Sequence, residues 1–146
     1  MRYESLSRAD TAAFAQELGE KAVPGDVFAL IGDLGVGKTV FTQGFAKGLG
    51  ISGYVNSPTF TILSIYEEGR LPLYHFDVYR IEEPEEMEEI GYEDYFYGNG
   101  VCLIEWADLI GELLPERTIK VTIRKNLAKG IDYRLITIEK DENTRG

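Results

Sequence analysis

The residues best suited to chemistry form one eight-residue run, Gly32-Asp-Leu-Gly-Val-Gly-Lys-Thr39, which has the pattern G-x-x-x-x-G-K-[ST]. Glycines adopt backbone conformations that side chains hinder, so successive amides can converge on phosphate oxygens. In this pattern the lysine reaches the β- and γ-phosphates of a nucleotide, and the following hydroxyl binds Mg²⁺. The run therefore predicts a nucleotide phosphate site made by Gly32, Asp33, Leu34, Gly35, Val36, Gly37, Lys38, Thr39 and the adjoining Val40.

A nucleotide hydrolase also needs a carboxylate near the metal, and two candidates end short apolar runs. Asp77 ends Leu-Tyr-His-Phe-Asp, and Glu105 ends Val-Cys-Leu-Ile-Glu. In an α/β sheet, ligands collect at the carboxyl ends of parallel strands, so both acids could face the glycine-rich loop. Two acids allow a division of labour, in which one steadies Mg²⁺ and the other orients the attacking water. The alternative for each is a partly solvated carboxylate at a strand end.

The elements that would position these groups follow from periodicity. A capping pair at Ser7 and Asp10, followed by apolar residues at helical spacing, predicts a helix over about 8–22. The nearly continuous apolar run over 26–31 predicts a strand buried on both faces, and a helix is expected over 38–48. The glycine-rich run therefore lies between a strand and a helix, as a phosphate-binding loop requires.

The rest of the chain alternates in the same way. A helix is expected to open at Pro84 and to carry Met87 and Ile90 inward. Further strands are expected over 59–66, 71–79, 101–106, 117–124 and 133–139. The predicted fold is α/β, a P-loop NTPase-like single domain over 1–146, with a mixed, mostly parallel central sheet flanked by helices. The last residues, about 141–146, are expected to form a flexible tail.

Composition narrows the class of protein further. With 44% hydrophobic and 27% charged residues, 146 residues can bury a core, which excludes wholesale disorder. There is no apolar run of about 20 residues and no apolar leader at the N-terminus, so we expect a cytoplasmic protein that does not enter a membrane. The lone Cys102 excludes an internal disulfide and a cysteine metal cage.

The charge is unevenly distributed. The net charge of −10 argues against a general nucleic-acid binder. Segment 81–116 holds 12 acidic residues and no Lys or Arg. This segment is either a solvated acidic face or a docking face for a basic partner.

Several motifs together resemble one known family. They are Gly32-Asp-Leu-Gly-Val-Gly-Lys-Thr39, Ser57-Pro-Thr-Phe60, Tyr74-His-Phe-Asp-Val-Tyr-Arg80, Pro84-Glu-Glu86 and Glu105-Trp106, in that order. Over roughly residues 5–137 the chain resembles the bacterial TsaE (YjeE) ATPases. The resemblance implies an ATPase that uses ATP and Mg²⁺, yields ADP, and assists threonylcarbamoyladenosine formation on tRNA beside the anticodon. It also implies that the TsaB and TsaD proteins are partners and that tRNA is met through their complex.

The resemblance also implies roles for single residues. Asp77 matches the family's proposed catalytic acid, beside Lys38, and Glu105 matches a carboxylate on the Mg²⁺ side, with Thr39. Thr59 matches a switch-like threonine that senses the γ-phosphate. Three further matches to nucleotide contacts are Thr11, Trp106 and Arg134.

Each of these last three residues has a simpler structural reading. Thr11 could instead lie on a helix surface, Arg134 could be a solvated strand charge, and Trp106 could pack at the sheet edge. Trp106 is followed here by Ala107-Asp108, where the family commonly has Pro-Glu, and alanine would let the next helix begin earlier. His75 is interpreted as a hydrogen-bonded packing residue in preference to a catalyst.

Two other functions fit the same phosphate site. A small-molecule or nucleotide kinase would need an acceptor pocket and an arginine-bearing lid, yet no Lys or Arg lies between Arg80 and Arg117. A non-catalytic nucleotide-sensing module would bind ATP only to set its affinity for a partner. A GTPase is less favoured because the chain has no Asn-Lys-x-Asp motif.

Overall fold

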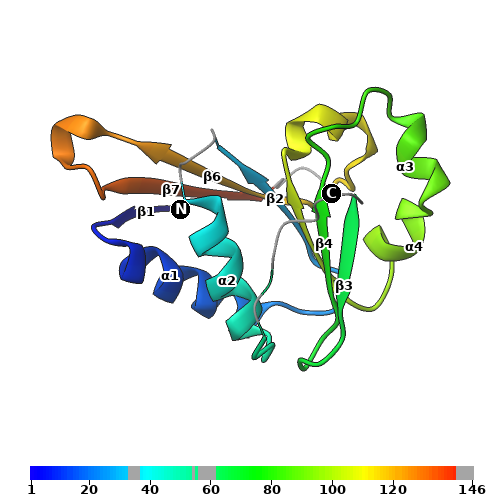
Figure 1. Cartoon of the computed structure of the whole chain (residues 1–146), viewed down its shortest axis with the longest axis horizontal. Coiled ribbons are helices and arrows are strands. Elements are labelled where there is room, and N and C mark those ends of the chain that lie inside the picture. Colours follow the sequence, from blue (N-terminus) through cyan, green and yellow to red (C-terminus); the bar gives the residue numbers. More distant parts are fainter. Residues whose placement is uncertain (33–36, 54, 56–61, 141–146) are drawn as a thin grey trace.

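The computed structural model describes residues 1–32, 37–53, 55 and 62–140. Seven strands form one sheet in the order β1-β7-β6-β2-β5-β4-β3 (Figure 1). The four central strands are parallel: β6 (Ile119–Lys125), β2 (Val27–Ile31), β5 (Val101–Glu105) and β4 (Leu73–Asp77). The outer strands pair antiparallel: β3 (Leu63–Tyr66) with β4, β7 (Arg134–Lys140) with β6, and β1 (Arg2–Ser5) with β7. The predicted mixed sheet with a mostly parallel centre is confirmed.

Helices cover both faces of this sheet. The long helices α1 (Arg8–Lys21) and α2 (Lys38–Gly48) lie together against one face, whereas α3 (Glu85–Glu89) and α4 (Tyr92–Phe96) lie against the other (Figure 1). Two 3₁₀ helices, η1 (Ala107–Leu113) and η2 (Leu127–Lys129), follow β5 and β6. Strand β2 shows the consequence of two covered faces, because Phe28 and Leu30 join the core under α1 and α2 whereas Val27 and Ala29 join the core on the other face.

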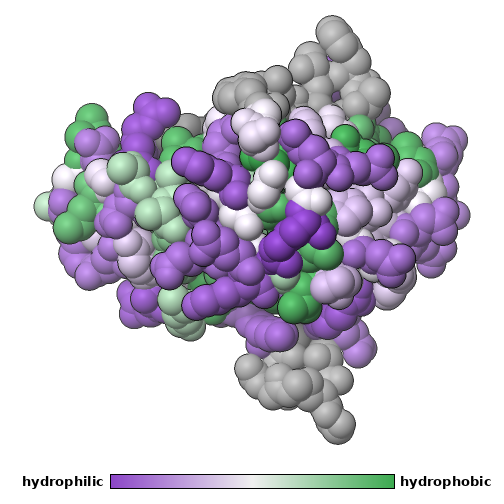
Figure 2. All heavy atoms as spheres, turned by 90° about the horizontal axis from the view of Figure 1, so that it is seen from below, coloured by the Kyte–Doolittle hydropathy of each residue, from purple (hydrophilic) through white to green (hydrophobic). Residues whose placement is uncertain are grey.

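One face of the molecule shows how polar and apolar residues are distributed on the surface. Seen from below the view of Figure 1, it is mostly hydrophilic, with hydrophobic residues in small separate groups (Figure 2). Among the described residues, no helix is long and apolar enough to cross a membrane. Cys102 is buried, and desolvation raises the pKa of its thiol to about 12, so it is a poor nucleophile.

The helix α1 begins where the capping pair predicts. The Ser7 side chain accepts a hydrogen bond from the Asp10 amide at 3.0 Å. Asp10 in turn accepts hydrogen bonds from the Leu6 amide at 3.0 Å and from the Tyr3 hydroxyl at 2.5 Å. The bond to Ser7 satisfies a backbone donor that a helix start leaves without a partner, and the bond from Tyr3 connects α1 to strand β1.

Helices α1 and α2 approach each other through glycine. A Cβ atom on Gly44 would lie 2.4 Å from the carbonyl oxygen of Ala12, and one on Gly48 would lie 2.2 Å from that of Gln16. Only the absence of side chains permits backbones this close. The close packing brings the first turn of α1 beside the first turn of α2, which is where the candidate site lies.

Most element boundaries agree with the sequence prediction within a few residues. Pro84 caps α3 and Met87 is buried, as expected, and η1 begins at Ala107, directly after Trp106. Strand β1 and helix α4 were not predicted, because each is only four or five residues long and lacks a distinct period. The start of the strand expected over 59–66, and the tail at 141–146, lie outside the described residues.

Candidate functional site

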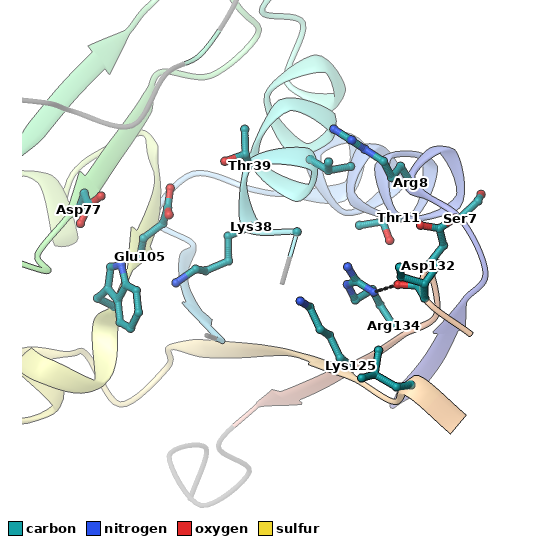
Figure 3. A pocket seen from close by; sticks show the side chains of 15 residues that line it. Ser7, Arg8, Thr11, Lys38, Thr39, Asp77, Glu105, Lys125, Asp132 and Arg134 are labelled. Carbon is teal, nitrogen blue, oxygen red and sulfur yellow. Dashed lines mark hydrogen bonds between the residues drawn. The ribbon is translucent and has the colours of Figure 1, made fainter. Parts of the chain in front are cut away.

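A cavity of about 500 Å³ opens beside the first turn of α2, at the carboxyl ends of β4 and β5 (Figure 3). Thr11 lines this cavity, and so does every described residue from Gly37 onward that the sequence predicts to belong to the site. Gly32 lies at the end of β2 and contacts Lys38, whereas residues 33–36 and Thr59 lie outside the described residues. The predicted residues in the wall are Thr11, Gly37, Lys38, Thr39, Val40, Asp77, Glu105, Trp106 and Arg134.

The first turn of α2 supplies the site's backbone donors. Gly37 precedes the helix with φ of 108°, a conformation that glycine adopts without strain, and its carbonyl accepts from the Phe41 amide at 3.0 Å. The first amides of a helix have no partner within the helix, and the helix dipole adds partial positive charge there. This end of the cavity is therefore suited to an anion.

Lys38 points into the cavity although its side chain is largely buried. Its ammonium group donates to the Gly32 carbonyl at 2.8 Å and lies 3.5 Å from the centre of the Trp106 ring. A carbonyl dipole and the negative face of an aromatic ring both stabilise a buried cation. The lysine side chain is thereby held beside Gly32, the residue that follows β2, and next to the first turn of α2.

The two predicted carboxylates are neighbours. Asp77 and Glu105 are register partners at the ends of the parallel strands β4 and β5. Burial raises the pKa of Asp77, and the nearby Glu105 carboxylate raises it further, against a hydrogen bond from the Tyr79 amide at 3.1 Å. Asp77 is therefore a stronger base than an ordinary aspartate.

Glu105 is the more deeply placed carboxylate, since only 5% of the residue is exposed. Its Oε2 atom lies 2.7 Å from Nε2 of His75, which comes from the neighbouring strand and is fully buried. The sequence-based interpretation of His75 as a hydrogen-bonded packing residue agrees with its burial. Its partner, however, is a residue of the site wall.

Trp106 has neighbours both in the packed structure and in the cavity. It packs against Tyr79, with ring centres 4.8 Å apart, and it also lines the cavity beneath the Lys38 ammonium. Its backbone is left-handed, with φ of 62°, which costs a non-glycine residue about 1 kcal/mol or more. Such strain clusters at functional sites, where the surrounding structure holds it in place.

The other end of the cavity is formed by segments distant in sequence. Thr11 is buried, contrary to a position on the helix surface, and its hydroxyl is 2.6 Å from that of Ser5. Arg134 is half-buried and donates to the carbonyls of Ile131 and Tyr133 at 2.9 and 2.7 Å. Figure 3 shows the two carboxylates at one end, Lys38 in the middle, and Arg134 with Lys125 and Arg8 toward the other end.

Six lining residues were not predicted. They come from the start of α1 with its cap, from the end of β6 and from the connection between β6 and β7, and they are Ser7, Arg8, Lys125, Leu127, Ile131 and Asp132. Ser7 was recognised only as a helix cap, and no local pattern marks the others as site residues. The only related signal is the excess of basic residues after position 116.

A mixed α/β sheet with a parallel centre defines a P-loop NTPase-like fold here. Strand β2 is followed by helix α2, which begins with a lysine and a hydroxyl residue, and carboxylates stand at the ends of β4 and β5. Residues 5–134 match the family described as "Threonylcarbamoyl adenosine biosynthesis protein TsaE". The chain belongs to the TsaE family.

Individual relatives agree over most of the chain. It is 50% identical over 137 residues to the tRNA threonylcarbamoyladenosine biosynthesis protein TsaE of Bacillus subtilis strain 168, covering 94% of this chain and 84% of that protein. It is 45% identical over 124 residues to the TsaE protein of Treponema pallidum, covering 85% and 91%. The crystal structure of Bacillus subtilis YdiB superposes with a TM-score of 0.80 at 42% identity, covering 99% of this chain and 87% of that one.

Proposed function

We propose that this chain binds ATP with Mg²⁺ and hydrolyses it as one component of the machinery that forms threonylcarbamoyladenosine on tRNA next to the anticodon. The observation that carries the proposal is the convergence of Lys38, Thr39, Asp77 and Glu105 on one cavity at the start of α2. The names of the relatives, which refer to threonylcarbamoyladenosine biosynthesis, support the biological role. We further propose that the chain works in the cytoplasm with the TsaB–TsaD complex and meets tRNA through it.

The donor set suits magnesium. Thr39 and Glu105 offer a hydroxyl and a carboxylate in the same cavity wall. Among the described residues, no three His, Cys, Asp or Glu side chains are grouped to hold a metal by themselves. Mg²⁺ commonly takes one or two protein oxygens together with phosphate oxygens and water, so this sparse set fits it. When bound there, Mg²⁺ would neutralise charge on the β- and γ-phosphates.

The protein's own groups then have distinct tasks. Lys38 exchanges the Gly32 carbonyl and the Trp106 ring for phosphate oxygens, which are stronger partners for an ammonium group. Asp77 orients the attacking water and accepts its proton, a role that its raised pKa favours. Arg134 extends positive charge along the cavity, away from the carboxylates.

Binding is tested first, with two lysines of the same helix. In equilibrium titrations with a non-hydrolysable ATP analogue, Lys38→Ala should weaken binding about 10- to 100-fold, because a charged hydrogen bond to phosphate is lost. Lys47→Ala, in the exposed last turn of α2, should bind as the wild type does. Equal affinities for the wild type and Lys38→Ala would show that this cavity is not the phosphate site.

The reaction is tested by following phosphate. Release of inorganic phosphate from ATP, measured with and without the TsaB–TsaD pair and tRNA, should be low for the chain alone and higher with its partners. Transfer of phosphate to a small-molecule acceptor would instead identify a kinase. Analogue binding without any phosphate release, under every combination, would identify a nucleotide-sensing module.

A further inference from the structure

His75 occupies an unusual place for a packing residue. It lies on β4 opposite Leu103 of β5 and two residues before Asp77, and it is completely buried. Residues two apart on a strand share a face, so His75 and Asp77 both lie on the face that α2 covers. The imidazole is therefore directly behind the carboxylate end of the cavity without forming part of its described wall.

The chemistry of its contact with Glu105 determines which group donates. An ionised carboxylate only accepts hydrogen bonds, so with Glu105 ionised the proton of this 2.7 Å contact belongs to Nε2 of His75, which then donates to Oε2. Only 5% of Glu105 is exposed, and hydrogen-bond donors of this kind offset the cost of burying a charged group.

We propose that His75 is a positioning residue for the metal-side carboxylate. Its Nε2–H group engages one oxygen of Glu105 and thereby fixes the orientation in which that carboxylate faces the cavity and Thr39. The inference rests on the proposed function, because the group being positioned is the one assigned to Mg²⁺. Donors behind metal-binding side chains orient them, and their loss commonly reduces metal affinity about 10- to 100-fold.

Two substitutions separate positioning from packing. The amide nitrogen of glutamine extends about as far as Nε2 of histidine, so His75→Gln keeps a donor for Glu105. Asparagine is one methylene shorter, so His75→Asn keeps polarity but cannot reach Oε2. Both replace the ring with an amide, so only the reach of the donor differs.

The experiment titrates Mg²⁺ against binding of a non-hydrolysable ATP analogue, with a parallel measurement in EDTA. His75→Asn should raise the Mg²⁺ concentration at half-maximal effect about 10- to 100-fold and leave the metal-free affinity unchanged, whereas His75→Gln should stay near the wild type. An unchanged Mg²⁺ dependence in His75→Asn would overturn the proposal. Equal impairment of both variants would also overturn it, because that result indicates a packing role.

A double variant protects the test against misfolding. In Glu105→Gln the buried carboxylate charge that His75 contacts is absent, so adding His75→Asn should be tolerated and should not change the Mg²⁺ dependence further. A further change would show that His75 acts independently of Glu105 and would overturn the inference. If the wild type itself bound the analogue without any Mg²⁺ dependence, the proposed function would fail together with this inference. If binding to the wild type depends on Mg²⁺ and this dependence is unchanged in the His75 variants, the inference is refuted but the proposed function is not.

Discussion

The close contact between α1 and α2 can be tested at a glycine, because alanine there would favour the helix by its intrinsic propensity but would collide with the neighbouring helix. Gly44 lies in the interior of α2, and a Cβ atom built on it would lie 2.4 Å from the Ala12 carbonyl oxygen. This is about 1 Å inside ordinary van der Waals contact, which begins near 3.4 Å. The obstacle is backbone of a packed helix, which cannot rotate away as a side chain could. Gly44→Ala therefore forces the two helices apart.

Two opposing contributions set the size of the effect. Alanine is favoured over glycine in a helix interior by about 1 kcal/mol, which would stabilise the variant if there were space. Overpacking a tight site costs about 1–3 kcal/mol, and a backbone obstacle places this site at the upper end. We therefore expect a net loss of about 2 kcal/mol in the free energy of unfolding. For a chain of this length the melting temperature should fall by roughly 4–8 °C.

Thermal and urea unfolding, followed by circular dichroism, measure this loss, and the chain offers a matched control. Among the described atoms nothing lies within 4 Å of a Cβ placed on Gly111. Gly111→Ala should therefore leave the free energy of unfolding unchanged or raise it by up to about 1 kcal/mol. Because α1 and α2 also bring Thr11 and Lys38 to one cavity, Gly44→Ala should weaken binding of the ATP analogue as well. A Gly44→Ala protein as stable as the wild type would refute the reasoning, since the helices could then separate without cost.

Three further predictions address catalysis, docking and pH. Asp77→Asn should lower phosphate release by about 10²- to 10⁴-fold and leave Mg²⁺-dependent binding of the ATP analogue intact. Glu105→Gln should instead make analogue binding less dependent on Mg²⁺. The opposite pattern would reverse the roles assigned to the two carboxylates. Changing the four glutamates of α3 (Glu85–Glu89) to glutamine should weaken association with TsaB–TsaD, most at low salt, and unaffected pull-down would favour a solvated acidic face. The Tyr3 hydroxyl and the Leu6 amide hold the pKa of Asp10 in the folded protein below its ordinary 3.8. The ionised carboxylate therefore stabilises the fold above pH 3.8. This contribution is lost as the pH falls from 3.8 through the lower pKa of the folded state. Urea midpoints between pH 7 and pH 3 should accordingly fall less steeply for Asp10→Asn, and identical slopes would contradict the assignment.

The sequence by itself determined those features of the fold and site that depend on residues close together in the chain. The strand–loop–helix unit around Lys38 was readable because strand periodicity, glycine content and helical spacing are all local properties. The two carboxylates, Asp77 and Glu105, were readable because each ends an apolar run, and buried parallel strands end at one edge of a sheet. The order of motifs then placed the chain among the TsaE proteins before its fold was known.

Only the tertiary structure decided which distant segments complete the site. Strand β7 lies between β1 and β6, which brings the start of α1 and the β6–β7 connection to the cavity although they are more than a hundred residues apart in the chain. The hydrogen bond from His75 to Glu105 likewise depends on β4 pairing with β5 in one register. Periodicity reports which face of an element is buried, but not which element covers it. Which element covers which face is decided by strand pairing and by the glycine contacts between α1 and α2. Both depend on the shapes of surfaces that meet only after folding.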